Sequence, residues 1–287
     1  QKEVRNQNML LNIFDVDHGA CALITTSNNR HLMIDCGHHA DKRWYPGNAL
    51  NAMGIYTLDR LFITHFDEDH CSGVGDLLNK TMVQALVTNN SLSPQLVRQM
   101  KSGHTLGNGV SRLLESMENT FTGGPVSAVD DADFGDTSFY VYRNEYNPFF
   151  GITDSNNLSL AIIVRCGPHT ILFPGDLEVA GWRALLTYPK FVSDLKDVNY
   201  FFASHHGRSN GYCAEVMSLC PNIQAVIFSD EGIVHETQKT ADLYRKHASG
   251  IHFGGSIRRV LSTRRDNSMK FHLSEHGGGT VELNVAA

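Results

Sequence analysis

Ionisable side chains are concentrated in the stretch Thr64 to Gly73, which reads THFDEDHCSG. Two histidines and three carboxylates fall within the six residues from His65 to His70. A stretch of this composition can be a solvated helix start with acidic capping residues. It can also bind a metal ion through imidazole and carboxylate groups. The segments that lie around it decide between these two interpretations.

Two further polar clusters follow apolar segments later in the chain. Gly175 and Asp176 come after TILFP, and the run from His205 to Gly207 comes after YFFAS. Alone, a Gly-Asp pair is usually a turn and a pair of histidines is usually a surface or core pair. Strand ends at one edge of an α/β sheet converge in space. Three such clusters, each directly after an apolar strand, therefore favour a metal site.

The elements that must position these clusters are strands and helices in mixed succession. Apolar segments bounded by turn residues predict strands over the ranges 9–16, 20–26, 31–37, 58–65, 156–167, 169–176, 198–207, 225–230, 258–265, 268–274 and 280–285. Helical patterns cover 109–119, 177–186, 214–219 and 236–248. We expect a single α/β domain over 1–287 built on two sheets, with a polar, Gly-rich insertion over the site at about 81–146.

Composition limits the partners and the compartment. The chain has 24 basic and 30 acidic residues and a formal net charge of -6, so no global positive field attracts a polyanion. Six cysteines form no CxxC pair, which favours a reduced, cytoplasmic protein. No apolar run approaches the roughly 20 residues of a membrane-spanning helix. We therefore expect no membrane segment.

Several blocks of the sequence resemble the metallo-β-lactamase fold, whose commonest metal signature is HxHxDH. The matching motif HxDxDH with a following Ser-Gly pair consists of His65, Asp67, Asp69, His70, Ser72 and Gly73. FDVDHGACALITT and HLMIDCG look like its paired opening strands and DxG turn, with Asp35 as the structural acid. NNLSLAIIVRCGPHTILFPGDLE and SHHGRSNGY are similar to the hydrolase domain of ComEC-type competence proteins, which act in DNA uptake. The resemblance implies a four-layer αββα sandwich of two mixed β-sheets flanked by helices.

The same resemblance implies two divalent cations and assigns their ligands. The first cation would bind His65 and Asp67, and Asp176 would bridge the two cations. The second would bind Asp69, His70 and His205, whereas His206 would pack behind the site. The usual third histidine of the first cation is missing. Asn156 and Asn157 stand at its place, and either one would supply an oxygen or hold a water.

The residues themselves predict the type of metal and reaction. Asp67, where a histidine is usual, makes the first site richer in oxygen, which favours manganese or magnesium over zinc. We expect Mn²⁺, with Zn²⁺ or Mg²⁺ as alternatives. Two cations about 3.5 to 4 Å apart can share a water and clamp both oxygens of a phosphoryl centre. A metal-bound hydroxide, oriented by Asp69 and Asp176, would then attack phosphorus.

Four further residues are candidates for contact with substrate. Arg208 and Asn210 closely follow the HHG run, and a guanidinium suits a phosphate or leaving oxygen, although a solvated turn explains Arg208 equally well. His235 precedes an expected helix start, where a phosphate or a simple capping role fits. Arg264 belongs to the dense basic cluster at 258–265, the one local patch able to offset the acidic background.

These features define four candidate functions. The first is a metal-dependent nuclease that cleaves single-stranded or accessible DNA, as the resemblance implies. The second is a phosphodiesterase that acts on a small cyclic or signalling nucleotide. The third is a zinc-dependent lactonase, thioesterase or β-lactamase, against which Asp67 and the missing histidine count. The fourth is an inactive partner-binding module of a defence or DNA-uptake complex, against which the near-complete ligand set counts.

Overall fold

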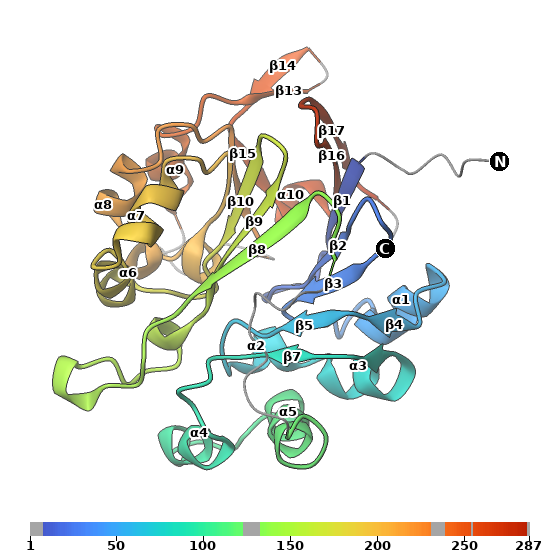
Figure 1. Ribbon diagram of the computed structural model, residues 1–287, viewed down its shortest axis with the longest axis vertical. Coiled ribbons are helices and arrows are strands. Elements are labelled where there is room, and N and C mark those ends of the chain that lie inside the picture. The colour runs from blue at the N-terminus through green and yellow to red at the C-terminus, as the bar shows by residue number, and fades with distance from the viewer. Residues whose placement is uncertain (1–7, 123–132, 231–238, 254, 286–287) are drawn as a thin grey trace.

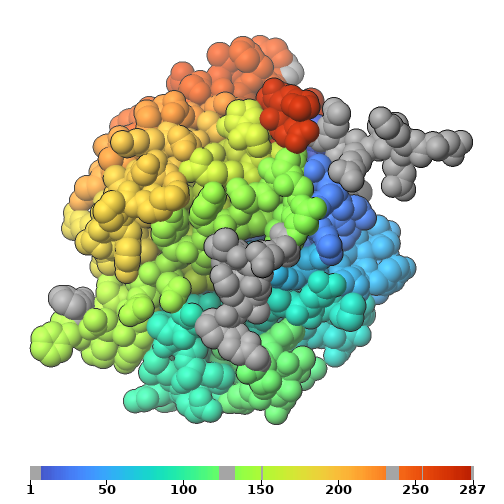
Figure 2. Space-filling view, in the orientation of Figure 1, coloured from blue at the N-terminus to red at the C-terminus, as the bar shows by residue number. Residues whose placement is uncertain are grey.

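The computed structural model describes residues 8–122, 133–230, 239–253 and 255–285. Two mixed sheets face each other, and helices cover the outer side of each (Figure 1). The predicted four-layer αββα sandwich is thus confirmed. In the space-filling view, the blue and cyan N-terminal part and the yellow and orange part around residues 179–218 occupy opposite sides of the molecule (Figure 2).

The first sheet has the strand order β17-β16-β1-β2-β3-β5-β7. Its strands are β1 (Asn8–Ile13), β2 (Ala22–Thr25), β3 (His31–Ile34), β5 (Arg60–Phe62), β7 (Leu86–Val87), β16 (Met269–Ser274) and β17 (Gly279–Leu283). The neighbours β3, β5 and β7 run parallel, and the other neighbouring pairs are antiparallel. Beside this sheet, β4 (Thr57–Leu58) pairs in parallel with β6 (Met82–Val83).

The second sheet has the strand order β15-β12-β11-β10-β9-β8. Its strands are β8 (Thr137–Tyr142), β9 (Ala161–Cys166), β10 (His169–Phe173), β11 (Tyr200–Phe202), β12 (Ala225–Phe228) and β15 (Val260–Ser262). From β10 to β15 the neighbours are parallel, whereas β8, β9 and β10 are antiparallel. A separate antiparallel pair joins β13 (Ile251–Phe253) to β14 (Ser256–Arg258).

Strands buried on both faces explain the continuous apolar runs in the sequence. In β9, Ile162 and Val164 point into the core between the sheets, and Ala161 and Ile163 pack against the outer helices. This alternation follows from the two-residue period of a strand. Burying each large apolar side chain contributes about 1.5–3 kcal/mol, so the two faces together hold the layers in place.

Helices on the two outer faces complete the layers. The first sheet is covered by α1 (Pro46–Ala52), α3 (Val74–Lys80), α4 (Pro94–Met100) and α5 (Asn108–Asn119). The second is covered by α6 (Val179–Leu185), α7 (Pro189–Leu195), α8 (Ala214–Ser218) and α9 (Ala241–Arg245). Short helical turns are α2 (Glu68–Cys71), α10 (Thr263–Asp266), η1 (Pro148–Phe150), η2 (Asn156–Leu158), η3 (Ser204–Gly207) and η4 (Ser209–Gly211). Within the described ranges, no helix has the length and apolar character needed to cross a membrane.

Two segments differ from the elements expected from sequence. The segment expected as an insertion, 81–146, contributes β7 to the first sheet and β8 to the edge of the second, and between them lie α4 and α5 (Figure 1). The predicted strand over 258–265 is wrong at its end, because Arg264 and Arg265 lie on the helical turn α10. A buried Asp266 carboxylate accepts the backbone N–H of Ser262 and ends the strand there.

Candidate metal centre

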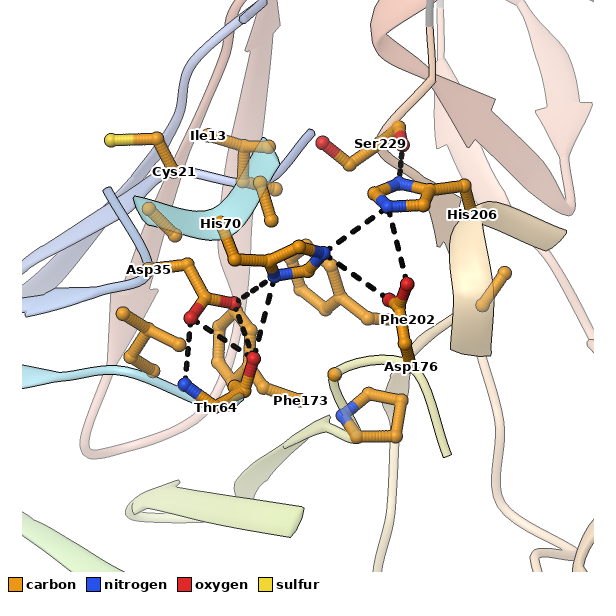
Figure 3. Close-up of a pocket in the computed structure, with 16 residues that line it drawn as sticks. Ile13, Cys21, Asp35, Thr64, His70, Phe173, Asp176, Phe202, His206 and Ser229 are labelled. Carbon is orange, nitrogen blue, oxygen red and sulfur yellow. Dashed lines mark hydrogen bonds and ion pairs between the residues drawn. The ribbon is translucent and has the colours of Figure 1, made fainter. Parts of the chain in front are cut away.

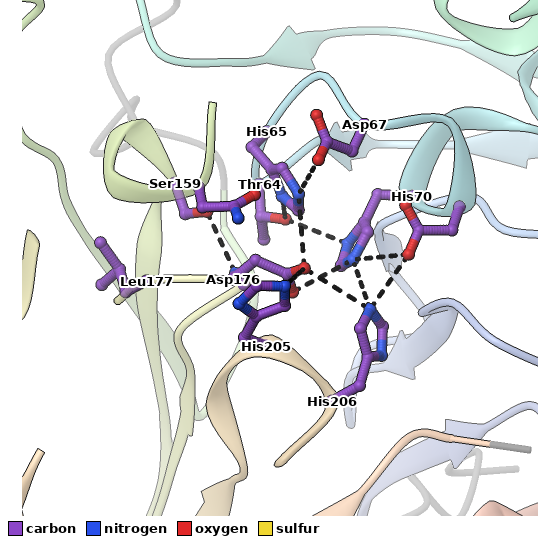
Figure 4. A network of polar contacts seen from close by, with 12 residues as sticks. Thr64, His65, Asp67, His70, Ser159, Asp176, Leu177, His205 and His206 are labelled. Atoms are coloured by element: carbon purple, nitrogen blue, oxygen red, sulfur yellow. Dashed lines mark hydrogen bonds and ion pairs between the residues drawn. The ribbon is translucent and has the colours of Figure 1, made fainter. Parts of the chain in front are cut away.

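Three strand ends bring the polar clusters together. The strand β5 runs into His65, β10 runs into Asp176, and its parallel neighbour β11 runs into the turn that carries His206. The Thr64 carbonyl accepts a hydrogen bond of 2.8 Å from the Leu160 N–H, which ties the first sheet to the second at this point. Side chains that are far apart in the sequence therefore meet in one polar network (Figure 4).

Asp35 orients the His70 ring from below. Its Oδ1 accepts the Thr64 N–H at 2.7 Å, and its Oδ2 lies 2.8 Å from the His70 Nδ1 (Figure 3). A carboxylate accepts hydrogen bonds, so the His70 proton sits on Nδ1 and the Nε2 lone pair faces the centre. This is the structural role that the sequence predicts for Asp35.

Two more imidazoles are turned in the same way. The Nδ1 of His206 donates to the Ser229 carbonyl at 2.7 Å. The Nδ1 of His65 lies 3.1 Å from the Thr64 Oγ1, which donates its own proton to Asp35 and therefore accepts from His65. Both rings are left with an Nε2 lone pair that can bind a cation.

Four side chains form a compact group. Their ligand atoms all lie within 4.8 Å of one another, and they belong to Asp69, His70, Asp176 and His206. The Nε2 of His206 lies 3.1 Å from the Asp69 Oδ2, and the Nε2 of His70 lies 3.3 Å from the Asp176 Oδ1. The two Nε2 atoms are 3.2 Å apart. Since two lone pairs repel, this donor set of two nitrogens and two carboxylates fits a divalent cation.

A second group lies on the other side of Asp176. The Nε2 of His65 lies 3.7 Å from the Asp176 Oδ2 and 3.8 Å from the Asp67 Oδ2. This nitrogen is buried and has no hydrogen-bond partner among the described residues. The Nε2 of His205 also lies 3.8 Å from the Asp176 Oδ2. A buried, unpaired nitrogen that faces two carboxylates fits a second cation, with Asp176 between the two groups.

Burial and charge shift the pKa values of the compact group in opposite directions. Ile13, Phe173 and Phe202 line the cavity behind it (Figure 3). Burial opposes a charge on His70, but the nearby carboxylates, Asp176 foremost, outweigh it and raise the His70 pKa well above its usual value. Burial likewise opposes ionisation of Asp176, but the surrounding histidines hold its pKa well below the usual range. The positive charge of His70 and the negative charge of Asp176 thus stabilise each other.

The HHG turn decides which histidine joins which group. His205 and His206 adopt φ values of 52° and 51°, in the left-handed region that residues other than glycine rarely occupy. The resemblance implies that His205 joins Asp69 and His70 and that His206 lies behind the site. In the structure His206 faces Asp69, whereas the His205 Nδ1 lies 3.5 Å from the Glu178 Oε1. The second histidine of the pair, not the first, thus completes the compact group.

The asparagines before β9 serve the backbone and a neighbouring acid. The Asn157 Oδ1 accepts the Gly181 N–H at 2.6 Å, and its Nδ2 donates to the Asp154 Oδ2 at 2.8 Å. This amide is committed to holding the start of α6, so the structure gives Asn157 a framework role in place of the expected ligand role. Asn156 points its Nδ2 at the Glu178 Oε1, 3.3 Å away.

The structure places two of the four expected substrate contacts beside the second group. The Arg208 Nη1 donates to the His205 Nε2 at 3.3 Å, and the Arg208 Nε is buried without a partner among the described residues. Asn210 instead donates to the Glu178 Oε1 at 2.6 Å. Arg208 is therefore positioned to contact a ligand of the site, whereas the Asn210 amide holds Glu178.

The other two expected contacts lie elsewhere. Arg264 pairs with the buried Asp230 at 3.3 Å, one residue beyond the Ser229 carbonyl that orients His206. His235 lies outside the described residues. The structure thus gives Arg264 a buried acidic partner behind the metal centre.

Two side chains near the centre had no signal in the sequence. The His18 ring packs against His206 with centroids 4.3 Å apart and a tilt of 42°, and burial together with the neighbouring His206 lowers the His18 pKa to about 4. Lys101, which follows α4, donates to the Asp67 Oδ1 at 2.6 Å. Lys101 belongs to no motif, and His18 lies within the block FDVDHGACALITT without being singled out there. Chain folding brings both residues to the site.

The fold and the clustered side chains define a class, namely proteins with the metallo-β-lactamase fold that carry a candidate metal centre. Within this class, the chain belongs to the anti-Pycsar protein Apyc1 family, whose sequence profile matches residues 14–228. A solved structure of the CmlA beta-hydroxylase E377D mutant superposes with a TM-score of 0.51 at 13% identity, covering 93% of this chain and 54% of that one. This likeness supports the fold alone.

Two curated relatives belong to the competence systems that the sequence resembles. The chain is 22% identical over 273 residues to competence protein ComA of Neisseria gonorrhoeae, covering 95% of this chain and 33% of the relative. It is 23% identical over 235 residues to ComE operon protein 3 of Bacillus subtilis (strain 168), covering 80% of this chain and 26% of the relative. The chain thus spans a third or less of each relative.

Proposed function

We propose that the protein is a two-metal phosphodiesterase that hydrolyses a nucleotide phosphodiester. The observation that carries the proposal is the setting of Asp176. Four imidazole Nε2 atoms surround its carboxylate at 3.3 to 3.8 Å, and they belong to His65, His70, His205 and His206. A carboxylate shared in this way suits a pair of cations. The cation that we propose is Mn²⁺, because Asp67 adds an oxygen ligand to the group around His65.

The residues of the chain divide the work between the two groups. His65 and Asp67 would hold one cation, and Asp69, His70 and His206 the other, with Asp176 between them. The His205 Nε2, which accepts a hydrogen bond from Arg208, would join His65 and Asp67 once Arg208 turns to the phosphate. Such cations, when bound, lower the pKa of a shared water and neutralise the phosphate oxygens. Asp69 and Asp176 accept hydrogen bonds from that water and orient it. Arg208 contacts the phosphate or its leaving oxygen through the free side of the guanidinium.

The charge distribution favours a small nucleotide over a long nucleic acid. In the C-terminal basic cluster, Arg258 makes two hydrogen bonds to Asp266, of 2.8 and 2.7 Å, and Arg264 pairs with Asp230. These arginines are already neutralised, so they offer little to a polyanion on a chain of net charge -6. Membership of the anti-Pycsar protein family is part of the support for this proposal. A cyclic or signalling nucleotide is our leading substrate.

DNA remains the second candidate substrate, and the competence relatives favour it. ComA and the ComE operon protein match over most of this chain. A lactonase, thioesterase or β-lactamase activity is disfavoured, because such chemistry relies on zinc and a full histidine set. A partner-binding module without turnover is disfavoured by the number of converging lone pairs.

The test compares four substrates with three metals. Protein freed of metal receives Mn²⁺, Mg²⁺ or Zn²⁺ and is incubated with bis-p-nitrophenyl phosphate, 3′,5′-cyclic nucleotides, labelled single-stranded DNA and a chromogenic lactam. We expect cleavage of the phosphodiesters, fastest with Mn²⁺ and with a cyclic nucleotide. Survival of every phosphodiester while the lactam is cut would overturn the proposal.

The matched variants are Asp176→Asn and Asp197→Asn. Replacing the shared carboxylate removes the negative charge between the two groups, so we expect a fall of at least about 1,000-fold in kcat. Asp197 is 56% exposed and pairs with Arg165, away from the centre, so its variant should match the wild type. Metal content by elemental analysis should fall below two ions per chain in the Asp176 variant only.

A further inference from the structure

Lys101 lies beside the metal centre and belongs to the segment that contains α4 and α5. Its Nζ lies 2.6 Å from the Asp67 Oδ1, 34 residues away in the sequence. The other oxygen of the same carboxylate, Oδ2, lies 3.8 Å from the His65 Nε2. Asp67 therefore stands between a cation-binding nitrogen and an ammonium group. The Lys101 side chain is 23% exposed, so the fold does not enclose it completely.

The framework holds Lys101 in this place. The Lys101 N–H closes α4 with a bond of 3.0 Å to the Val97 carbonyl, and Val97 is buried in the core with α5. The carboxylate of Glu68 accepts the N–H groups of Gly109 and Val110 in the first turn of α5, at 2.8 and 3.0 Å. Two consecutive residues of the metal loop, Asp67 and Glu68, thus hold two parts of one segment.

The group around His65 lacks one expected ligand. The sequence lacks its usual third histidine, and Asn157, which stands at that place, is committed to the backbone and Asp154. An ammonium has three donors and no lone pair, so Lys101 cannot replace a metal ligand. Its ammonium can donate one hydrogen bond to Asp67 and another to a phosphate oxygen that reaches the group around His65.

We propose that Lys101 is a phosphate-binding residue of this site, supplied by the α4–α5 segment. The inference rests on the proposed phosphodiesterase function and assigns a further substrate contact to it. On binding, a non-bridging phosphate oxygen accepts from the Lys101 ammonium while Asp67 keeps its own hydrogen bond. The segment that forms part of the fold's outer layer thereby becomes a determinant of substrate affinity.

The experiment measures phosphate binding and turnover separately. Inorganic phosphate is titrated calorimetrically into Mn²⁺-loaded wild type, Lys101→Met and Lys101→Arg, and KM and kcat for bis-p-nitrophenyl phosphate are measured on the same samples. Loss of one charge-assisted hydrogen bond corresponds to about a tenfold weaker phosphate affinity and a similar rise in KM. The arginine variant should recover most of both losses.

The matched control is Lys80→Met. Lys80 also pairs with an aspartate, Asp76, one helical turn away on α3, so the variant removes a similar ion pair outside the site. Its phosphate affinity, KM and metal content should equal those of the wild type. Thermal unfolding of all variants distinguishes loss of binding from loss of folding.

The outcomes separate this inference from the proposed function. Unchanged phosphate affinity in Lys101→Met overturns the role of Lys101, even where the wild type cleaves phosphodiesters. Loss of bound Mn²⁺ or of folding in that variant, without recovery by arginine, assigns Lys101 to the framework and also overturns it. A wild type that binds phosphate through Lys101 but cleaves no phosphodiester instead refutes the proposed function.

Discussion

At the scale of single residues, the centre depends on where the imidazole protons sit. In His70, His65 and His206 the Nδ1 proton is held by Asp35, Thr64 and the Ser229 carbonyl, respectively. In the neutral imidazole each Nε2 is thereby a lone pair that faces Asp176. A bound cation displaces the proton that the raised pKa values keep on His70 and His206 in the metal-free protein. The residues that fix these tautomers bind no metal themselves, but they determine whether the ligands are ready to bind.

The variant Asp35→Asn tests this orientation at constant side-chain size. An asparagine that keeps the Thr64 contact turns its NH₂ toward His70, where a proton acceptor is needed, so the ring loses its partner. We expect Mn²⁺ affinity to fall by about 10- to 100-fold, measured by competition with a fluorescent chelator. Asp59→Asn is the control, because Asp59 is also a buried carboxylate and accepts the His31 N–H. Asp59 precedes β5, whereas the metal loop follows that strand. Equal loss of affinity in both variants would contradict the role of Asp35.

At the scale of elements, the metal loop and α5 are joined through Glu68. Glu68, which lies between the predicted ligands Asp67 and Asp69, caps the N-terminus of α5 through two backbone N–H groups. A carboxylate at this place also interacts favourably with the helix dipole. Gly109 has to be small, because a Cβ there would lie 2.2 Å from the Cys71 carbonyl oxygen.

Removing this cap should loosen the segment that carries Lys101. We expect Glu68→Ala to lower the free energy of unfolding by about 1–2 kcal/mol and to raise amide hydrogen exchange in α5. Glu115→Ala on the exposed face of α5 is the control and should change stability by less than about 0.5 kcal/mol. If both variants unfold alike in urea, Glu68 has no capping role.

At the scale of the whole molecule, folding stability is linked to protonation of the centre. In the protein without metal, the raised pKa values of His70 and His206 contribute stability that is present below their unfolded value of about 6.5 and is lost as the pH rises through the folded values. The lowered pKa values of Asp69 and Asp176 contribute stability that is lost as the pH falls through their folded values. These four groups favour the metal-free protein between about pH 4 and 6.5. The lowered pKa values of His18, His65 and His205 oppose them below about pH 6.5.

Metal binding should reverse the alkaline side of this profile. A cation needs deprotonated imidazoles, so its affinity rises with pH while metal-free stability falls. We expect the increase in Tm caused by Mn²⁺ to grow from pH 6 to pH 8, as measured by thermal unfolding with and without chelator. The Asp176→Asn variant should show a much smaller increase. A Tm shift of equal size at every pH would refute this linkage.

The layers and most strands could be predicted because they depend on local pattern. Apolar runs such as β9 and β10 are buried on both faces, and their length and bounding glycines predict strands without knowledge of partners. The end of β15 could not be predicted, because the Asp266 carboxylate there replaces sheet pairing with a helical turn. The short helix α4 was also missed, since its stability comes from packing on α5.

By itself the sequence determined the kinds of ligands and the loops that carry them. The spacing HxDxDH and the positions of Asp176 and the HHG turn after buried strands are enough, because strand ends at one sheet edge converge. Only the tertiary structure decided which histidine faces Asp69, which groups the Asn157 amide hydrogen-bonds, and whether Lys101 reaches Asp67. These depend on two left-handed backbone angles and on contacts between distant segments, which no local pattern encodes.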